Sequence, residues 1–139
     1  MPALTRWYLK AALLYFVAAL LLAIALAAQH VVALPEWLGA LSPVFFHLFM
    51  VGWVTQLIFG VAYWMFPKHT REQPHGDERV AHGAFFLLNA GLLLRVVGEP
   101  LNSISSAPAW GWVLVVSAVL QWLAGLGFVA VTWRRVREK

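Results

Sequence analysis

Hydrophobic residues form four long blocks along the chain, and these blocks are the strongest pattern in the sequence. Each block lacks Asp, Glu, Lys and Arg, and the blocks cover residues 11–28, 37–67, 80–94 and 101–133. A transmembrane helix needs about 20 mostly apolar residues in a row. The pattern therefore predicts four membrane-spanning helices, at residues 7–33, 42–66, 79–98 and 108–134.

The prolines support these boundaries, because proline lacks the N–H that the interior of a helix needs. All seven are expected between the spans or at their ends: Pro2, Pro35, Pro43, Pro67, Pro74, Pro100 and Pro108. The predicted fold class is therefore all-α, an integral membrane four-helix bundle that residues 1–139 form as a single domain.

Basic residues are concentrated at the ends of the spans and in one loop. They precede the first span, occupy the loop between the second and third spans, and close the chain: Arg6, Lys10, Lys68, Arg71, Arg79, Arg134, Arg135, Arg137 and Lys139. The other two loops contain no Lys or Arg. Since cytoplasmic segments carry the excess of basic residues, both termini are expected to be cytoplasmic. The expected location is a bacterial cytoplasmic (inner) membrane.

The composition excludes several classes of protein. Hydrophobic residues make up 62% of the chain and charged residues 12%, against about 25% charged residues in soluble domains, so a water-soluble enzyme is excluded. The net charge of +4 indicates no nucleic-acid partner, because the basic residues flank the spans instead of forming one stripe. Cysteine is absent, so any metal site has to use His, Met or carboxylate ligands.

Ionisable side chains within membrane spans are rare and mark candidate functional sites. His47 lies 21 residues before Lys68, and His30 lies 20 residues after Lys10. Counted from these cytoplasmic lysines at about 1.5 Å per residue, both imidazoles are expected at one depth, near the outer boundary of the membrane. Arg95, in the third span, is expected slightly deeper.

Two imidazoles at one depth beside an arginine provide what haem b requires: two axial nitrogens for the iron and a cation for the propionates. We therefore predict that His47, His30 and Arg95 bind haem b, with His47 on the haem iron. Three alternatives remain open. His47 is alternatively a hydrogen-bonded interfacial histidine. His30 alternatively faces water, and Arg95 alternatively forms an i,i+4 pair with Glu99.

The other three histidines belong to the second loop and the start of the third span. His69, His75 and His82 are separated by six and seven residues, and these spacings match no metal-ligand pattern. They are interpreted as solvated histidines near the cytoplasmic surface.

Small and amide residues repeat on the second and fourth spans. Two sets with a spacing of four form these faces: Gly52, Gln56 and Gly60, and Ser117, Gln121 and Gly125. The first set lies opposite His47 at about 100° per residue. Because small residues allow close packing of membrane helices, the second and fourth helices are expected to pack directly, with a hydrogen bond between Gln56 and Gln121.

The stretch from Pro43 to Pro67, PVFFHLFMVGWVTQLIFGVAYWMFP, resembles the second helix of haem-copper oxidase subunit I and of nitric oxide reductases. Residues 87–95 and 117–122 are more weakly similar to NnrS-type haem membrane proteins. The resemblance implies that His47 is an axial haem ligand and suits Arg95 as a partner of the propionates. It also implies electron transfer, or the binding of a small gas such as nitric oxide or oxygen.

The chain departs from these families in two respects. Their copper site needs an adjacent His-His pair, which is absent here, so a complete oxidase or reductase is not expected. Their second low-spin ligand lies on a later helix that this chain lacks, so His30, Met50 or His47 of a second subunit is expected to replace it. The last option makes the protein a homo-oligomer.

An alternative function is a cofactor-free membrane subunit or assembly factor of a respiratory complex. Such a protein would pack against its respiratory-chain partner through the glycine and glutamine faces. Mutation of Gln56 or Gly60 would then impair it more than mutation of His47.

Overall fold

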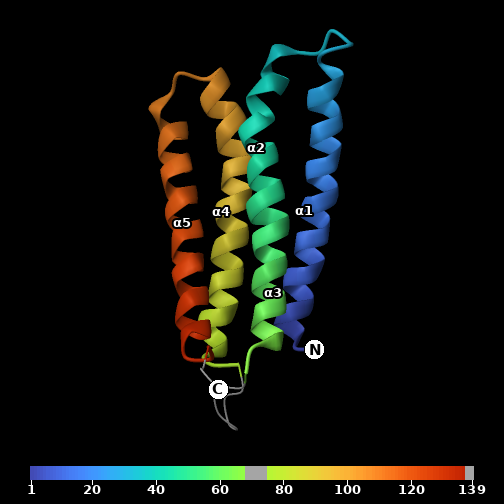
Figure 1. Cartoon of the computed structure of the whole chain (residues 1–139). Coiled ribbons are helices and arrows are strands. Elements are labelled where there is room, and N and C mark those ends of the chain that lie inside the picture. Colours follow the sequence, from blue (N-terminus) through green and yellow to red (C-terminus); the bar gives the residue numbers. More distant parts are fainter. Residues whose placement is uncertain (68–74, 137–139) are drawn as a thin grey trace.

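The computed structural model describes residues 1–67 and 75–136, and within these ranges the chain is helical with no strand. Four helices are long and apolar enough to cross a membrane: Ala3–Ala28, Glu36–Met65, Glu78–Ile104 and Pro108–Trp133. In Figure 1 they are α1, the span that contains α2 and α3, α4, and α5. The expected all-helical chain with four apolar membrane-length helices is confirmed.

The second span is a continuous helical segment with changes of winding. A 3₁₀ segment, Glu36–Leu41, leads into α2 (Ser42–His47), a π-helical segment (Leu48–Thr55) and α3 (Gln56–Met65). Pro43 stands in the first turn of α2, a position at which helices tolerate proline. His47 therefore lies at the junction between ordinary and π-helical winding.

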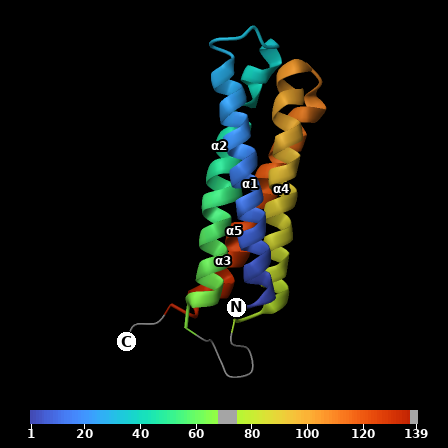
Figure 2. The ribbon, with the colours of Figure 1, turned by 90° about the vertical axis from the view of Figure 1, so that its right-hand side faces the viewer.

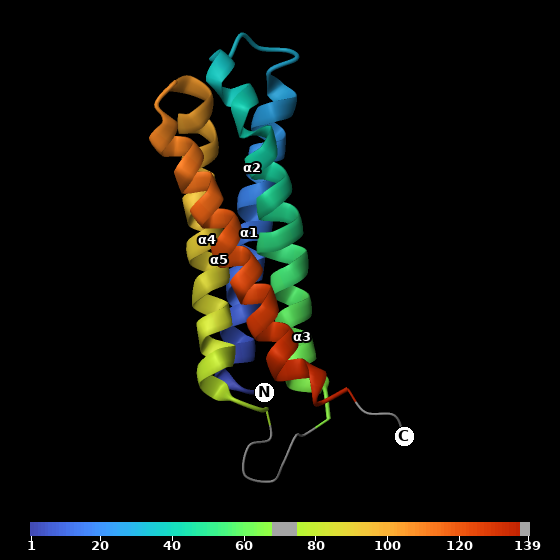
Figure 3. The same ribbon diagram turned by 90° about the vertical axis from the view of Figure 1, so that its left-hand side faces the viewer.

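The helices run up and down as two antiparallel hairpins. α1 lies beside α2 and α3, and α4 lies beside α5 (Figures 1 and 2). Figure 3 shows that α5 crosses the bundle obliquely, beside α4 at one end and approaching α3 at the other. At that second end Phe59 stacks on Phe128, with 3.8 Å between the ring centroids. The start of α1 and the end of α5 also lie there, and its cytoplasmic orientation stays a prediction.

Glycines set the distance between α1 and the second span. A Cβ atom on Gly60 would lie 2.7 Å from Cβ of Tyr8, and one on Gly52 would lie 2.8 Å from Cβ of Tyr15. Gln56, between the two glycines, is 0% exposed. The small-residue face predicted for the second span is therefore buried inside the chain's own bundle.

A second close contact joins α4 to α5. The Ser117 hydroxyl donates a 2.6 Å hydrogen bond to the Gly91 carbonyl. A Cβ atom on Gly91 would lie 2.9 Å from the Ser117 carbonyl oxygen, which belongs to the rigid helix backbone. Gly125, on the same helix pair, has no atom within 4 Å of the corresponding position.

These two glycines make a matched pair of substitutions. We expect Gly91→Ala to lower the free energy of unfolding by about 1–3 kcal/mol, because the added methyl group forces α4 and α5 apart. Gly125→Ala is expected to raise it by about 0.5–1 kcal/mol through helix propensity alone. Unfolding in mixed detergent micelles measures both, and a loss of equal size in the two variants would contradict the close contact at Gly91.

Several predicted helix ends are wrong. α1 ends at Ala28 and not at 33, and α4 continues to Ile104 and not 98, with Pro100 inside it. A proline removes one backbone hydrogen bond but does not stop a helix whose other bonds persist, and membrane helices tolerate it. The expectation that every proline lies outside the spans or at their ends fails at this residue.

The predicted hydrogen bond between Gln56 and Gln121 is also wrong. Gln56 and Asn89 exchange two hydrogen bonds of 3.3 Å through their side-chain amides, and the Tyr15 hydroxyl donates to Asn89 Oδ1 at 3.0 Å. Gln121 instead donates to the Ser117 hydroxyl at 3.1 Å. The fourth membrane-length helix, α5, packs mainly on α4. Asn89 of α4 therefore takes the place expected for Gln121 of α5.

Candidate functional site

His47 is the last residue of α2, and its ring is held by the helix that carries it. Nδ1 lies 2.9 Å from the Pro43 carbonyl oxygen, one turn earlier. A carbonyl oxygen only accepts hydrogen bonds, so Nδ1 carries the proton and donates it. Nε2 of the neutral ring is therefore left with a free lone pair, which is the form of imidazole that binds a metal.

The π-helical segment begins directly after His47. The Thr55 hydroxyl donates a 2.8 Å hydrogen bond to the Met50 carbonyl, five residues earlier. The wider π-helical winding also changes the rotation per residue. A regular α-helix would place Val51 on the same side as His47, whereas Val51 packs against both hydrophobic cores. Short π-helical segments within α-helices are frequent at functional sites.

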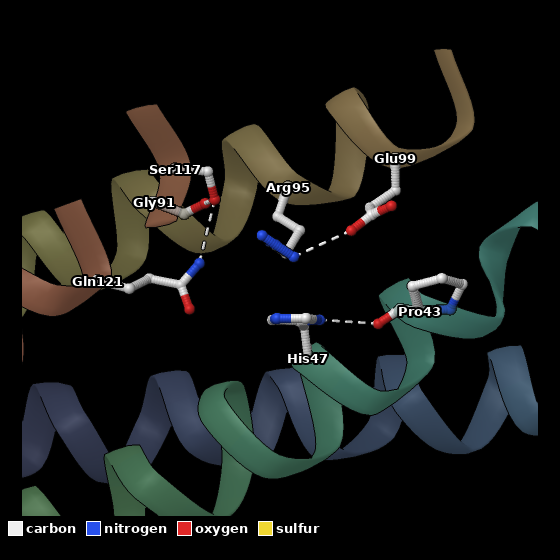
Figure 4. Close-up of polar contacts among 7 residues, drawn as sticks. All are labelled: Pro43, His47, Gly91, Arg95, Glu99, Ser117 and Gln121. Atoms are coloured by element: carbon white, nitrogen blue, oxygen red, sulfur yellow. Dashed lines mark hydrogen bonds and ion pairs between the residues drawn. The ribbon is translucent and has the colours of Figure 1, made fainter. Parts of the chain in front are cut away.

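Polar residues of α4 and α5 lie opposite His47. Figure 4 shows the His47 ring, the Arg95 guanidinium and the Gln121 amide pointing toward one another across the space between the second span and the second hairpin. All three side chains are only partly exposed. The bundle thus brings together His47 and Arg95, as the sequence predicts, and adds Gln121, which was expected to bond Gln56.

Among the described residues, Arg95 has one hydrogen-bond partner, and some of its N–H donors are unused. Its Nη1 donates to Glu99 Oε1 at 3.0 Å, and each side chain is 17% exposed. The i,i+4 pair left open by the sequence is therefore present. Nε of Arg95 is buried and finds no hydrogen-bond partner in the part of the chain that the structure describes. Because a buried donor without a partner costs about 1–3 kcal/mol, the guanidinium has capacity for a further acceptor.

His30 does not lie level with His47, so the expected pairing at one depth is wrong. Tyr8 packs against Gly60 and Tyr15 against Gly52, and this antiparallel register sets His47 level with residues 20–21. His30 follows nine or ten residues later, about 14 Å farther out at ~1.5 Å per residue. It lies exposed in the turn after α1.

The error comes from the reference points used to count depth. Counting placed Lys10 level with Lys68, whereas the register sets Lys10 level with Leu57 and Ile58. The helices are offset by about ten residues, or ~15 Å, relative to that assumption. The water-facing alternative for His30 agrees with its exposed position.

Met50 lies one turn beyond His47 on the same helix, and its side chain is 52% exposed. The two axial ligands of a haem stand on opposite faces of the ring. A ring placed between Met50 and His47 would have to cut through the helix that carries both. The geometry therefore gives Met50 a place beside a haem at His47 but no place across the iron from it.

The other described histidines lie at the opposite end of the bundle. Nδ1 of His82 donates to the Glu78 carbonyl at 2.7 Å, and its ring meets the Trp7 ring edge-on at 5.6 Å. His75 stacks on the Tyr63 ring at 5.1 Å. His69 lies outside the described residues. A cavity of about 730 Å³, lined in part by Trp64, His75 and Glu78, opens at this end.

Among residues 1–67 and 75–136, no group of three or more His, Asp or Glu side chains is placed to hold a bare metal ion. Haem does not need such a group, since the porphyrin brings its own nitrogen donors and asks the protein for axial ligands. A single free Nε2 with an arginine beside it fits that requirement, and the unpaired Nε of Arg95 fits an acidic substituent.

Sequence reasoning missed the carbonyl that orients His47 and the central position of Asn89. Asn89 also donates to the Phe85 carbonyl at 2.7 Å, so it joins α4, α3 and Tyr15 of α1 in one partly buried network. Its position at membrane depth was the available signal. Its partners depend on the register of three helices, which the sequence does not state.

Fold and site together define a class: a four-helix membrane protein with a histidine–arginine cluster between its two hairpins. Comparison with family models, with curated proteins and with solved structures found no match. The resemblance of residues 43–67 to the second helix of haem-copper oxidase subunit I stays a prediction.

Proposed function

We propose that this chain is a haem b-binding protein of the bacterial cytoplasmic membrane, related to haem-copper oxidase subunit I. The observation that carries the proposal is the state of His47, whose Nδ1–H is bound to the Pro43 carbonyl and whose Nε2 has no hydrogen-bond partner among the described residues. Histidines that bind a metal through one ring nitrogen usually donate the other ring N–H to a carbonyl or carboxylate, which fixes the ring orientation. His47 is then the axial ligand of the iron.

Arg95 is the proposed partner of the haem propionates. Its guanidinium faces His47 (Figure 4), Nη1 donates to Glu99, and Nε is buried with no hydrogen-bond partner among the residues that the structure describes. A carboxylate accepts charge-assisted hydrogen bonds from an arginine more strongly than from a neutral donor. The pair with Glu99 holds the guanidinium in place and leaves donors for the cofactor.

Haem in this position supplies a one-electron carrier or, if one axial position is open, a site for a small gas such as nitric oxide or oxygen. The chain's own contribution is orientation of the imidazole, a compensating cation and an apolar membrane environment. The absence of an adjacent His-His pair from the sequence is the reason that oxygen or nitric oxide reduction is not proposed.

A cofactor-free membrane subunit or assembly factor of a respiratory complex remains the second candidate. Its expected docking face, Gly52, Gln56 and Gly60, is buried within the chain and cannot reach a partner. The observation in its favour is on α5, where Gly125 has no atom within 4 Å of an added Cβ and Trp122 is 63% exposed. A partner helix can approach closely there.

The test of the proposed function is the reduced-minus-oxidised optical spectrum of the protein purified in detergent after expression with added haem precursor. We expect the Soret and α bands of haem b. Addition of carbon monoxide to the reduced protein separates an open gas-binding iron from an iron with two protein ligands. A colourless protein would overturn the proposal and favour the assembly subunit.

A further inference from the structure

Within residues 1–67 and 75–136, one chain offers one axial ligand at the level of His47. Four of the five histidines are described. His30 lies about 14 Å farther out, while His75 and His82 are at the other end of the bundle. His69 falls outside the described residues.

Methionine does not complete the site either. Met50 shares a helix turn with His47 and has no place across the iron. Met1 and Met65 both line the cavity at the far end of the bundle. None of the histidines and methionines in the described part of the chain can therefore be the second ligand of a haem at His47, which favours a ligand from outside the chain.

We infer that two copies of this chain share one haem, each contributing His47 to the same iron. The inference rests on the proposed function and names the partner of its site. A two-fold axis along the membrane normal keeps both copies in the same orientation and at the same depth. It therefore places the two His47 residues at equal depth on opposite sides of the axis, as the two axial positions require.

The state of the side chains suits this symmetric arrangement. Each copy brings a His47 with the proton fixed on Nδ1, so both Nε2 atoms have lone pairs. Each copy also brings one Arg95, so two guanidinium groups can serve the two propionates of one haem. Each copy therefore contributes the same iron ligand and the same cation, as a symmetric dimer requires.

The surface next to His47 is suited to a second copy. Phe46 and Met50 stand one turn apart beside His47, and they are 59% and 52% exposed. The haem and the partner copy would cover this apolar stripe. The inference also narrows the function, because an iron with two histidine ligands has no open position for a gas and is suited to electron transfer.

The test begins with wild-type protein in detergent, its mass measured by light scattering and its haem by the pyridine haemochrome assay. We expect dimers with one haem for every two chains and no change of the reduced spectrum with carbon monoxide. Monomers that hold one haem per chain and ignore carbon monoxide would overturn the shared site and leave haem binding intact. Protein without haem would overturn the proposed function itself.

Mixed dimers test the contribution of each copy. Wild-type and His47→Ala chains with different affinity tags are expressed together and purified through both tags in turn. We expect the mixed dimer to lose haem or to hold it with one histidine and bind carbon monoxide. A mixed dimer of wild type and His82→Ala is the control and should match wild type. A six-coordinate, carbon monoxide-insensitive haem in the His47→Ala mixture would overturn the inference.

Discussion

We expect haem to be lost from the purified protein when His47 is replaced by Ala, and to be retained when His82 is replaced by Ala. This is the largest effect expected from a single substitution. The imidazole is the axial ligand in the proposed site, and its removal should lower haem content about tenfold or more, because even residues that only support a metal ligand are worth 10–100-fold in affinity. Haem per chain, measured by the pyridine haemochrome assay, checks the result.

His82 is a close structural control for His47. Both rings donate Nδ1–H to the backbone carbonyl four residues earlier, at 2.7 Å for His82 and 2.9 Å for His47. Both side chains are partly buried. They differ in their surroundings, since His82 faces the Trp7 ring at the other end of the bundle. A difference in haem content therefore reports the site and not the local hydrogen bond.

Two further measurements distinguish loss of the iron ligand at His47 from haem binding elsewhere and from damage to the fold. His75→Ala tests the cavity at the far end of the bundle, which His75 lines, and should leave haem content unchanged. Free imidazole added to His47→Ala should restore part of the haem, because it supplies the missing nitrogen without repairing the chain. Equal haem in the His47, His75 and His82 variants would remove His47 from the site.

The spans were predictable because a membrane imposes one simple requirement on the sequence. A helix has to remain apolar for about 20 residues to cross the hydrocarbon, and four stretches meet that requirement. The buried small-residue face of the second span was also predictable, since Gly52 and Gly60 allow close approach wherever their helix packs.

Relative heights and partners were not predictable, because they depend on register between helices. Hydropathy constrains where a helix crosses the membrane only to within a turn or two, and lysine side chains reach the interface from different depths. Setting Lys10 level with Lys68 misplaced His30 by about 14 Å. For the same reason Gln56 was assigned to Gln121, while Asn89 holds that position.

The local winding at the site was also beyond the sequence. A π-helical segment differs from an α-helix by a small change in hydrogen bonding, and Leu48–Thr55 has no residue that demands it. His47 itself was found because an ionisable residue in an apolar span is conspicuous. The carbonyl that orients it belongs to the backbone of Pro43, and only the structure reveals that contact.

Arg135 was interpreted from the sequence as one of several basic residues that set the orientation of the chain, yet it is 1% exposed. Nε donates to the Pro67 carbonyl at 3.0 Å, and Nη2 donates to the carbonyls of Tyr63 and Phe66 at 2.9 and 2.7 Å. These carbonyls belong to the last turn of α3 and the residues just after it. A helix end leaves such groups without partners and carries partial negative charge, so Arg135 caps α3.

Replacing Arg135 by Ala is expected to lower the free energy of unfolding by about 2–4 kcal/mol. Three charge-assisted hydrogen bonds disappear, each worth roughly 1.5–3 kcal/mol before water replaces part of them. Burial lowers the pKa of Arg135, but its ordinary value is so high that the guanidinium stays charged near neutral pH. Arg135→Lys should recover only part of the loss, because an ammonium lacks the planar fork that reaches three carbonyls.

Arg134 is the matched control, since it is the neighbouring basic residue and its side chain is exposed. Arg134→Ala removes the same charge from the same end of the chain and should change the free energy of unfolding by less than about 0.5 kcal/mol. Unfolding in mixed micelles, followed by the fluorescence of the tryptophans, measures both variants. If the two losses are equal, charge near the membrane surface explains them; a loss confined to Arg135 assigns the stability to the cap that fastens the end of α5 to the end of α3.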